Sequence, residues 1–194
     1  MALSSKCKTR RKCADTTRIA ILEAAREKFA HSGYDQTGLR EIAAAAGVDA
    51  SLICRYFGSK QELLAAVLDC QSKFSGALAE HNQGMGARLA EQLLMHPDKA
   101  GAPTQLLVML RAASSPEASG LLKKSIETGF LAPLRARLTG DHRAERALLI
   151  ASSIFGVAVM RFVLSDGELT HDGQLAALLG RLLQESIEPE KAEA

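Results

Sequence analysis

The chain of 194 residues has no tryptophan, only two tyrosines and six phenylalanines. It also lacks any run in which β-branched residues alternate with polar ones. Strands favour aromatic and β-branched residues, whereas alanine and leucine, which are abundant here, favour helices. These absences argue against a β-rich fold, and the composition predicts an all-α protein.

Signals of metal or catalytic chemistry are missing as well. The cysteines form no C-x-x-C pair and no histidine pattern accompanies them, so the sequence predicts no zinc site. It contains no nucleophile motif, no glycine-rich phosphate loop and no paired carboxylates at a useful spacing. We therefore expect neither an enzyme nor a bound cofactor.

No stretch of the sequence is apolar for long enough to cross a membrane. The longest apolar run extends from Ala147 to Met160 and is interrupted by Ser152 and Ser153, whereas a spanning helix needs about 20 apolar residues. The N-terminus is basic and lacks the apolar core of a secretory signal. We expect a soluble, cytoplasmic protein with no membrane partner.

Charge is nearly balanced overall but unevenly distributed. Residues 1–60 contain 11 Lys and Arg and 6 Asp and Glu, whereas residues 61–194 contain 13 and 16. A basic N-terminal third suits a polyanionic partner. Five of the cations cluster in residues 1–14, which we expect to be a disordered basic tail. Two interpretations of this tail stay open: it is simply solvated, or it also touches phosphates.

The most informative stretch is residues 37–60. It predicts a helix capped by Thr37, then a tight turn at Gly47, because glycine adopts the left-handed conformation that ends helices. A second helix over residues 50–57 follows, capped by Asp49. Two short helices joined in this way form a helix-turn-helix, whose second helix can enter the DNA major groove.

Other helix signals follow along the chain. Ser59 begins a capping box that opens a helix running to about Leu78. Gly129 and Pro133 lie inside a later helix, where we expect a kink or a break. Asp141 is placed to cap the long helix after it. We expect about nine helices in all.

A set of residues at fixed spacing surrounds the helix-turn-helix. Its order is ILEAA at residues 21–25, F at 29, GY at 33–34, T at 37, IA at 42–43, AGV at 46–48 and YFGSK at 56–60. This order resembles the DNA-binding domain of the tetracycline-repressor (TetR) family. The resemblance implies a three-helix DNA-binding domain at residues 15–75, joined to a helical ligand-binding and dimerisation domain at residues 76–194.

Helical spacing places Ser51, Cys54 and Arg55 on the exposed side of the second helix. Arg55 can bind a phosphate or the edge of a guanine. Lys60 lies at the start of the next helix, where its ammonium and the backbone N–H groups can bind the same anion. Three positions depart from the family pattern: Cys54 stands where tyrosine is usual, Asp49 replaces a serine cap, and Gly38 replaces a second threonine or serine. Together, these arguments and the resemblance imply contacts to an operator in double-stranded DNA from Thr37, Arg40, Ala50, Ser51, Cys54, Arg55, Tyr56 and Lys60.

In the C-terminal part, Arg161 lies in an apolar run, where it must reach solvent, pair with a carboxylate or meet a ligand. We expect an apolar cavity beside the kinked helix. It would hold a hydrophobic effector against Leu89, Leu93, Met109, Ile126, Phe130 and Arg161. Surplus apolar positions in residues 147–164 and a leucine stripe in the last helix predict a homodimer interface that includes Phe155, Leu175, Leu179 and Leu182.

These observations lead to one functional hypothesis with three alternatives. The hypothesis is a transcriptional repressor that a hydrophobic small molecule releases from a palindromic operator. A thiol-responsive regulator using Cys54 is an alternative. An architectural DNA protein fits poorly, because coating DNA needs no large apolar second domain. An enzyme built on the C-terminal helices has no motif in its support.

Overall fold

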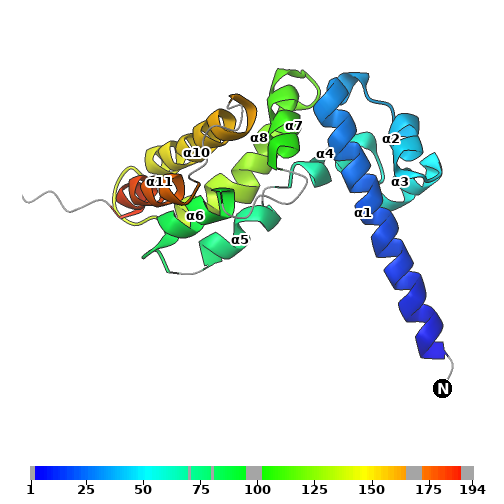
Figure 1. Cartoon of the computed structure of the whole chain (residues 1–194), viewed down its shortest axis with the longest axis horizontal. Coiled ribbons are helices and arrows are strands. Elements are labelled where there is room, and N and C mark those ends of the chain that lie inside the picture. Colours follow the sequence, from blue (N-terminus) through cyan, green and yellow to red (C-terminus); the bar gives the residue numbers. More distant parts are fainter. Residues whose placement is uncertain (1–2, 70, 80, 95–101, 165–171, 189–194) are drawn as a thin grey trace, which may run out of the picture. The chain divides into compact units, whose positions relative to one another are not determined.

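The computed structural model describes residues 3–69, 71–79, 81–94, 102–164 and 172–188, and no strand occurs among them. The all-α prediction is confirmed. Two π-helical turns, Glu127–Leu131 and Met160–Leu164, accompany the helices. The helices in Figure 1 are α1 (Leu3–Gln36), α2 (Leu39–Ala46), α3 (Ala50–Phe57), α4 (Lys60–Val67), α5 (Gln71–Ala79), α6 (Met85–Leu94), α7 (Ala102–Ser114), α8 (Ser119–Ile126), α9 (Ala132–Arg137), α10 (Arg143–Val159) and α11 (Asp172–Ile187).

The chain folds into two compact units. The first unit combines residues 1–68 with residues 107–122, and the second unit combines residues 69–106 with residues 123–194. The end of α7 and the start of α8 therefore belong with the N-terminal helices, whereas we expected everything after residue 75 to form one domain. A hydrophobic pattern predicts where helices lie but not which neighbours they pack against.

In the first unit, α1 packs against α2 and α4. Its buried side chains begin at Ile21 and continue with Ala25 and Phe29, at the spacing of one helical face. Near its end α1 is broken at Gly33, whose φ of 78° suits glycine. The backbone is helical from Leu3 onward, through most of the stretch that we expected to be disordered. Lys and Arg are good helix formers, and no glycine or proline interrupts them there.

The helix expected to run from Ser59 to about Leu78 is instead two helices. α4 ends at Val67, and Leu68 follows with φ −81° and ψ 3°, outside the α-helical range. No glycine or proline marks the break. The two helices bury their apolar residues in different units, Leu64 in the first and Leu78 in the second. Tertiary packing therefore overrides the continuous helical pattern.

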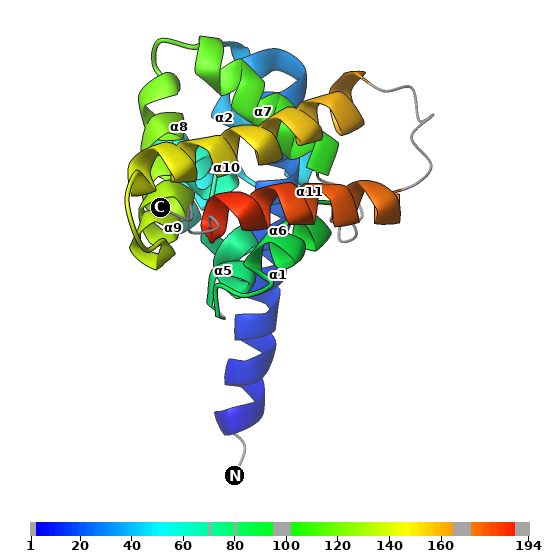
Figure 2. The same ribbon diagram turned by 90° about the vertical axis from the view of Figure 1, so that its left-hand side faces the viewer.

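A close crossing of α6 and α11 lies at the centre of the second unit (Figure 2). A Cβ on Gly86 would lie 2.3 Å from the carbonyl oxygen of Gly180, and a Cβ on Gly180 would lie 3.0 Å from Cα of Ala87. Only glycine permits this approach of two backbones. Gln184 holds the crossing, since its Oε1 accepts from the N–H of Gly86 at 2.9 Å and its Nε2 donates to the carbonyl of Asn82 at 3.1 Å.

The helix that contains Pro133 neither breaks nor ends. A π-helical turn joins α8 to α9, and the N–H of Ala132 donates to the carbonyl oxygen of Glu127, five residues back. This wider turn accommodates Pro133, which lacks an N–H and whose ring would clash with the carbonyl of Gly129 in a regular helix. The π-helical turn thus relieves the steric strain that we expected at Pro133.

The start of α10 also differs from the prediction. Its N-cap is His142, in the left-handed conformation with φ 55°, and not Asp141. Arg146 shapes this end, because its guanidinium donates to the carbonyl oxygen of Asp141 at 2.9 Å. The same guanidinium donates to the carbonyls of Ser186 and Ile187 at the C-terminal end of α11, where a cation is favourable.

Candidate nucleic-acid interface

The turn between α2 and α3 has the geometry that the sequence predicts. Gly47 is left-handed, with φ 66° and ψ 32°, and its N–H donates to the carbonyl of Ala44 at 3.2 Å. Asp49 then caps α3, with its Oδ1 accepting from the N–H of Ser51 at 2.8 Å. This hydrogen bond lowers the pKa of Asp49, so the carboxylate is ionised at neutral pH. Both predictions for the turn are confirmed.

The two faces of α3 differ sharply. Ile53 and Phe57 are buried, whereas Ser51, Cys54 and Arg55 are exposed, as helical spacing predicts. A helix of eight residues is marginal by itself, so the buried pair anchors the polar face. The arrangement presents a hydroxyl, a thiol and a guanidinium to solvent from one short helix.

Neighbouring helices add further polar groups. Arg40 is exposed on α2, and Ala50, Tyr56 and Lys60 are half-buried. The ammonium of Lys60 lies 4.2 Å from the centroid of the Tyr34 ring, a cation–π contact at the N-terminus of α4. The cap predicted at this terminus is confirmed, because the hydroxyl oxygen of Ser59 accepts from the N–H of Glu62 at 3.1 Å.

Thr37 is the exception among the predicted contact residues. Its side chain is only 2% exposed, and its hydroxyl donates to the carbonyl of Gly33 at 2.7 Å. The N-cap of α2 is instead Gly38, whose N–H donates to Oε2 of Glu41 at 2.9 Å. The predicted cap is wrong, and the Thr37 hydroxyl is bonded inside the protein rather than turned toward a phosphate. The glutamate three residues after Gly38 is the sequence signal that identifies the true cap.

A second buried hydroxyl links the turn between α7 and α8 to the end of α1. Ser115 is 5% exposed, donates to Oδ1 of Asp35 at 2.9 Å and accepts from the N–H of Ala118 at 3.1 Å. Tyr34 lies beside the same group, and its pKa is raised by burial and then by the carboxylates of Glu117 and Asp35. Sequence reasoning missed this link, because a serine and an aspartate so far apart in the chain leave no local signal.

The structure adds little support for a metal site or for a redox role of Cys54. Within the described residues, no group of three or more His, Cys, Asp and Glu side chains is placed to hold a metal ion. Cys54 is a free, exposed thiol on α3. Accessibility alone does not make a redox switch, because reactivity also needs a group that stabilises the thiolate.

Two family descriptions match the chain. Residues 21–67 match "Bacterial regulatory proteins, tetR family", and residues 83–187, more than half of the chain, match "Tetracyclin repressor-like, C-terminal domain". The chain belongs to the TetR family of bacterial regulators. The first match contains the whole of α2, α3 and α4, so the resemblance that the sequence showed is confirmed.

Curated relatives of this TetR-family chain match over about a quarter of its length. The HTH-type transcriptional repressor Rv3405c of Mycobacterium tuberculosis is 48% identical over 50 residues, which is 26% of this chain and 27% of the relative. RaaS, an HTH-type transcriptional regulatory protein of the same organism, is 49% identical over 54 residues, 28% of this chain and 25% of the relative. The chain thus spans about a quarter of the length of these relatives.

Solved structures match over most of the chain. A TetR-family regulator from Streptomyces coelicolor is 26% identical with a TM-score of 0.57, covering 89% of this chain and 95% of that one. FadR from Bacillus subtilis, in complex with stearoyl-CoA, is 20% identical with a TM-score of 0.66, covering 88% and 98%. NalD, the secondary repressor of the MexAB-OprM efflux pump in Pseudomonas aeruginosa, is 18% identical with a TM-score of 0.69, covering 91% and 99%. The last two support the fold alone.

The residues predicted to bind an effector are distributed over both units. Leu89, Leu93 and Phe130 are buried in the second unit, and Ile126 there is half-buried, whereas Met109 belongs to the first unit. The predicted effector residues therefore come from both units, and the single site that the sequence suggested stays a prediction. The register of a helix does not show which unit each of its ends joins.

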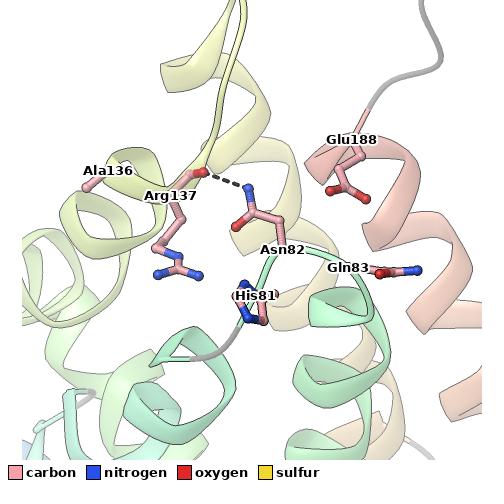
Figure 3. A pocket seen from close by; sticks show the side chains of 6 residues that line it. All are labelled: His81, Asn82, Gln83, Ala136, Arg137 and Glu188. Carbon is pink, nitrogen blue, oxygen red and sulfur yellow. Dashed lines mark hydrogen bonds between the residues drawn. The ribbon is translucent and has the colours of Figure 1, made fainter.

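Arg161 is half-buried, and its guanidinium lies 5.8 Å from the centroid of the neighbouring Phe162 ring. Two cavities among the described residues are lined by other residues and are open to solvent. One, of about 570 Å³, surrounds His142. Another, of about 550 Å³, is drawn in Figure 3 and is lined by His81, Asn82, Gln83, Ala136, Arg137 and Glu188. Both are bordered by polar and charged side chains, unlike the apolar cavity that we expected.

Large apolar side chains are exposed along α10, its π-helical turn and α11. We call this surface the apolar strip; it consists of Leu148, Leu149, Phe155, Met160, Leu164, Leu178 and Leu182. Of the predicted dimerisation residues, Phe155 and Leu182 lie in the strip and Leu175 is half-buried. Leu179 is 5% exposed and packs inside its own unit, so its neighbour Leu178 takes the outward position.

Among the described residues, one helix, Arg143–Leu164, is long and apolar enough to cross a membrane by length and composition. Only 22% of its most apolar window is buried. That fraction includes Ala147, Ile150 and Ile154, which pack within the second unit. Because leaving the unit would expose these residues, we interpret the helix as a packed element with one uncovered face.

We expect Asp49 to have opposite effects on folding and on DNA affinity. Its carboxylate caps α3, but it also places a negative charge where phosphates would approach. Asp49→Ser keeps a cap acceptor and removes the charge, so it should leave the unfolding temperature nearly unchanged and raise DNA affinity. Asp49→Ala removes the cap and should lower the unfolding temperature. Circular dichroism and fluorescence anisotropy measure the two quantities.

The pH dependence of folding stability tests the capping role of Asp49. The pKa of Asp49 lies below its ordinary value of 3.8, so its stabilising effect is complete above pH 3.8 and is lost as pH falls through the lowered value. The difference in unfolding temperature between wild type and Asp49→Ala should stay constant from pH 8 to about pH 5 and narrow only below about pH 4. A difference that disappears near neutral pH would contradict the capping role.

Proposed function

We propose that this TetR-family chain is a transcriptional repressor that binds a palindromic operator as a homodimer and is released by a hydrophobic small molecule. The observation that carries the proposal is the exposed polar face of α3, on a helix held by its turn, its cap and two buried residues. In a dimer, two such helices would enter successive major grooves about 34 Å apart. The part of the chain that matches the tetR family description, residues 21–67, contains α3, and one relative of the chain is named as a repressor.

Arg55→Ala should weaken operator binding without unfolding the protein, because Arg55 is exposed and outside the core. Loss of a bidentate contact to guanine costs about 1–3 kcal/mol, or a roughly 5- to 150-fold rise in Kd. Tyr56→Phe, which loses only a hydroxyl, should have a smaller effect. The operator is first selected from a pool of random duplexes, and Kd is then measured by fluorescence anisotropy at one salt concentration.

Arg143→Ala is the matched control, because Arg143 is an exposed arginine at the start of α10 in the second unit. It should bind the operator like wild type. If Arg55→Ala and Tyr56→Phe both keep the wild-type Kd, α3 is not the recognition helix.

The apolar strip supports the homodimer. Five large apolar side chains lie exposed on α10 and α11, which pack side by side, and two more on the π-helical turn after α10; patches of this kind mark interaction surfaces. Two helices from each subunit would form a four-helix interface, and two-fold symmetry pairs the same surface from both copies. Fully burying each leucine contributes roughly 1.5–3 kcal/mol. A second copy of the chain therefore supplies a partner with a complementary apolar face.

A charge in the apolar strip should separate the subunits. Leu178→Glu is expected to raise the dimer dissociation constant at least about a hundredfold, because an unpaired buried carboxylate costs several kcal/mol. Ala79→Glu, at an exposed position of α5, is the control and should remain dimeric. Light scattering at micromolar concentration measures the mass. A wild-type monomer, or a Leu178→Glu protein with the mass of a dimer, would contradict the interface.

Two features support an effector site in the second unit. Both π-helical turns lie at predicted effector residues, with Phe130 in the first and Arg161 in the second, and π-turns are frequent at functional sites. The Phe130 ring packs against Phe74, with centroids 4.9 Å apart, in an apolar interior. The hydrogen bond from Ser115 to Asp35 would carry a shift of α7 and α8 to the segment before α2.

Stearoyl-CoA and choline are named for two structural neighbours, and they serve as probes with and without a long apolar chain. An apolar effector that prefers the released state should raise the unfolding temperature and weaken operator binding by roughly 5- to 150-fold. We expect stearoyl-CoA to do both and choline to do neither. The same response in Arg161→Leu would remove the anchoring role of Arg161 and leave the apolar site intact. Release by choline alone would overturn the hydrophobic site.

A further inference from the structure

The first unit has no excess of positive charge apart from its first residues. Residues 15–68 and 107–122 contain seven Lys and Arg and eight Asp and Glu. Residues 1–14 contain five Lys and Arg and no acidic residue. Neutralisation of phosphates supplies most of the sequence-independent affinity of proteins for DNA. The recognition helix therefore belongs to a unit whose attraction for a polyanion resides almost entirely in this short segment.

The segment continues a helix that passes the end of α3. The guanidinium of Arg18 in α1 lies 5.0 Å from the centroid of the ring of Phe57, the last residue of α3. With a rise of 1.5 Å per residue, Lys12 and Lys6 follow about 9 and 18 Å farther along the axis of α1. The major groove is about 12 Å wide, so these distances are comparable to the separation of the two phosphate backbones that border it.

The N-terminal turns of α1 extend past the helices that they accompany. In Figure 1 this end of α1 continues beyond α2, α3 and α4. From residue 14 onward, where burial is described, the first buried residue of α1 is Ile21, and the match to the tetR family description also begins at residue 21. The basic segment thus lies outside the stretch that matches the family description.

We propose that residues 3–14 form a basic arm that binds the DNA backbone beside the half-site contacted by α3 and supplies most of the salt-sensitive affinity. The arm neutralises phosphates and carries no sequence information, whereas α3 supplies the base contacts. DNA is favoured over an anionic membrane because the arm is continuous with a helix that contacts the end of α3. The inference rests on the proposed function, since it assumes that α3 contacts DNA.

The salt dependence of operator binding measures the contribution of the arm to DNA affinity. Each phosphate neutralised contributes about 0.9 to the slope of log K against log salt concentration. The triple variant Arg10→Gln, Arg11→Gln and Lys12→Gln should therefore reduce the slope by about 3. Between 50 and 200 mM salt, wild type should lose about 40-fold more affinity than this variant. A chain shortened by residues 2–13 should show a larger reduction and provides a second test if the triple variant folds poorly.

The matched control is Lys123→Gln, Lys124→Gln and Arg143→Gln, which removes three exposed charges from the second unit. Its slope should stay within about one unit of wild type, because net charge alone is a weak long-range effect in salt. If the arm variant and this control have the same slope, the arm does not bind phosphates. Arm-dependent binding to phosphatidylglycerol vesicles with an unchanged DNA slope would likewise overturn the proposal and point to a membrane.

The outcomes distinguish failure of the arm proposal from failure of the repressor proposal. If wild type selects a specific duplex and the arm variants leave the salt slope unchanged, the repressor proposal stands and the arm proposal is wrong. If wild type shows no preference among duplexes but the slope depends on the arm, the arm binds DNA and the repressor proposal is wrong.

Discussion

The DNA-binding part of this chain depends on keeping an eight-residue helix folded. Such a helix is marginal in water, so the conformation of α3 is imposed by its surroundings. Gly47 ends the preceding helix, Asp49 caps α3, and Ile53 and Phe57 are buried. With its ends and one face fixed, the opposite face can hold Arg55 and its polar neighbours in a constant arrangement, which specific contacts to DNA bases require.

The last turn of α1, from its break at Gly33 onward, is held by two hydrogen bonds close to that helix pair. The buried hydroxyls of Thr37 and Ser115 both bond to this turn, one to Gly33 and the other to Asp35. A buried hydroxyl is tolerated only when it is hydrogen-bonded, so both bonds specify the path of the chain. Because Ser115 lies in the turn between α7 and α8, this turn is hydrogen-bonded directly to the end of α1 that precedes α2.

Local rules predicted the helix-turn-helix and missed features that depend on distant partners. Gly47 and the cap at Ser59 are signals confined to a few residues, and both were placed correctly. The break before α5, the packing of residues 107–122 in the first unit and the burial of Leu179 depend on neighbours far along the chain. Pro133 is an intermediate case: its strain was predictable, but a kink and a π-helical turn both relieve it, and only packing selects between them.

The most direct test of the central claim, that α3 of each subunit enters the major groove of a palindromic operator, is a hydroxyl-radical footprint of the wild-type protein on its selected duplex. The account predicts two protected patches on one face of the DNA, related by two-fold symmetry and centred one helical turn apart, about 10 base pairs. Continuous protection that spreads as protein is added, or a single protected patch at saturation, would contradict it.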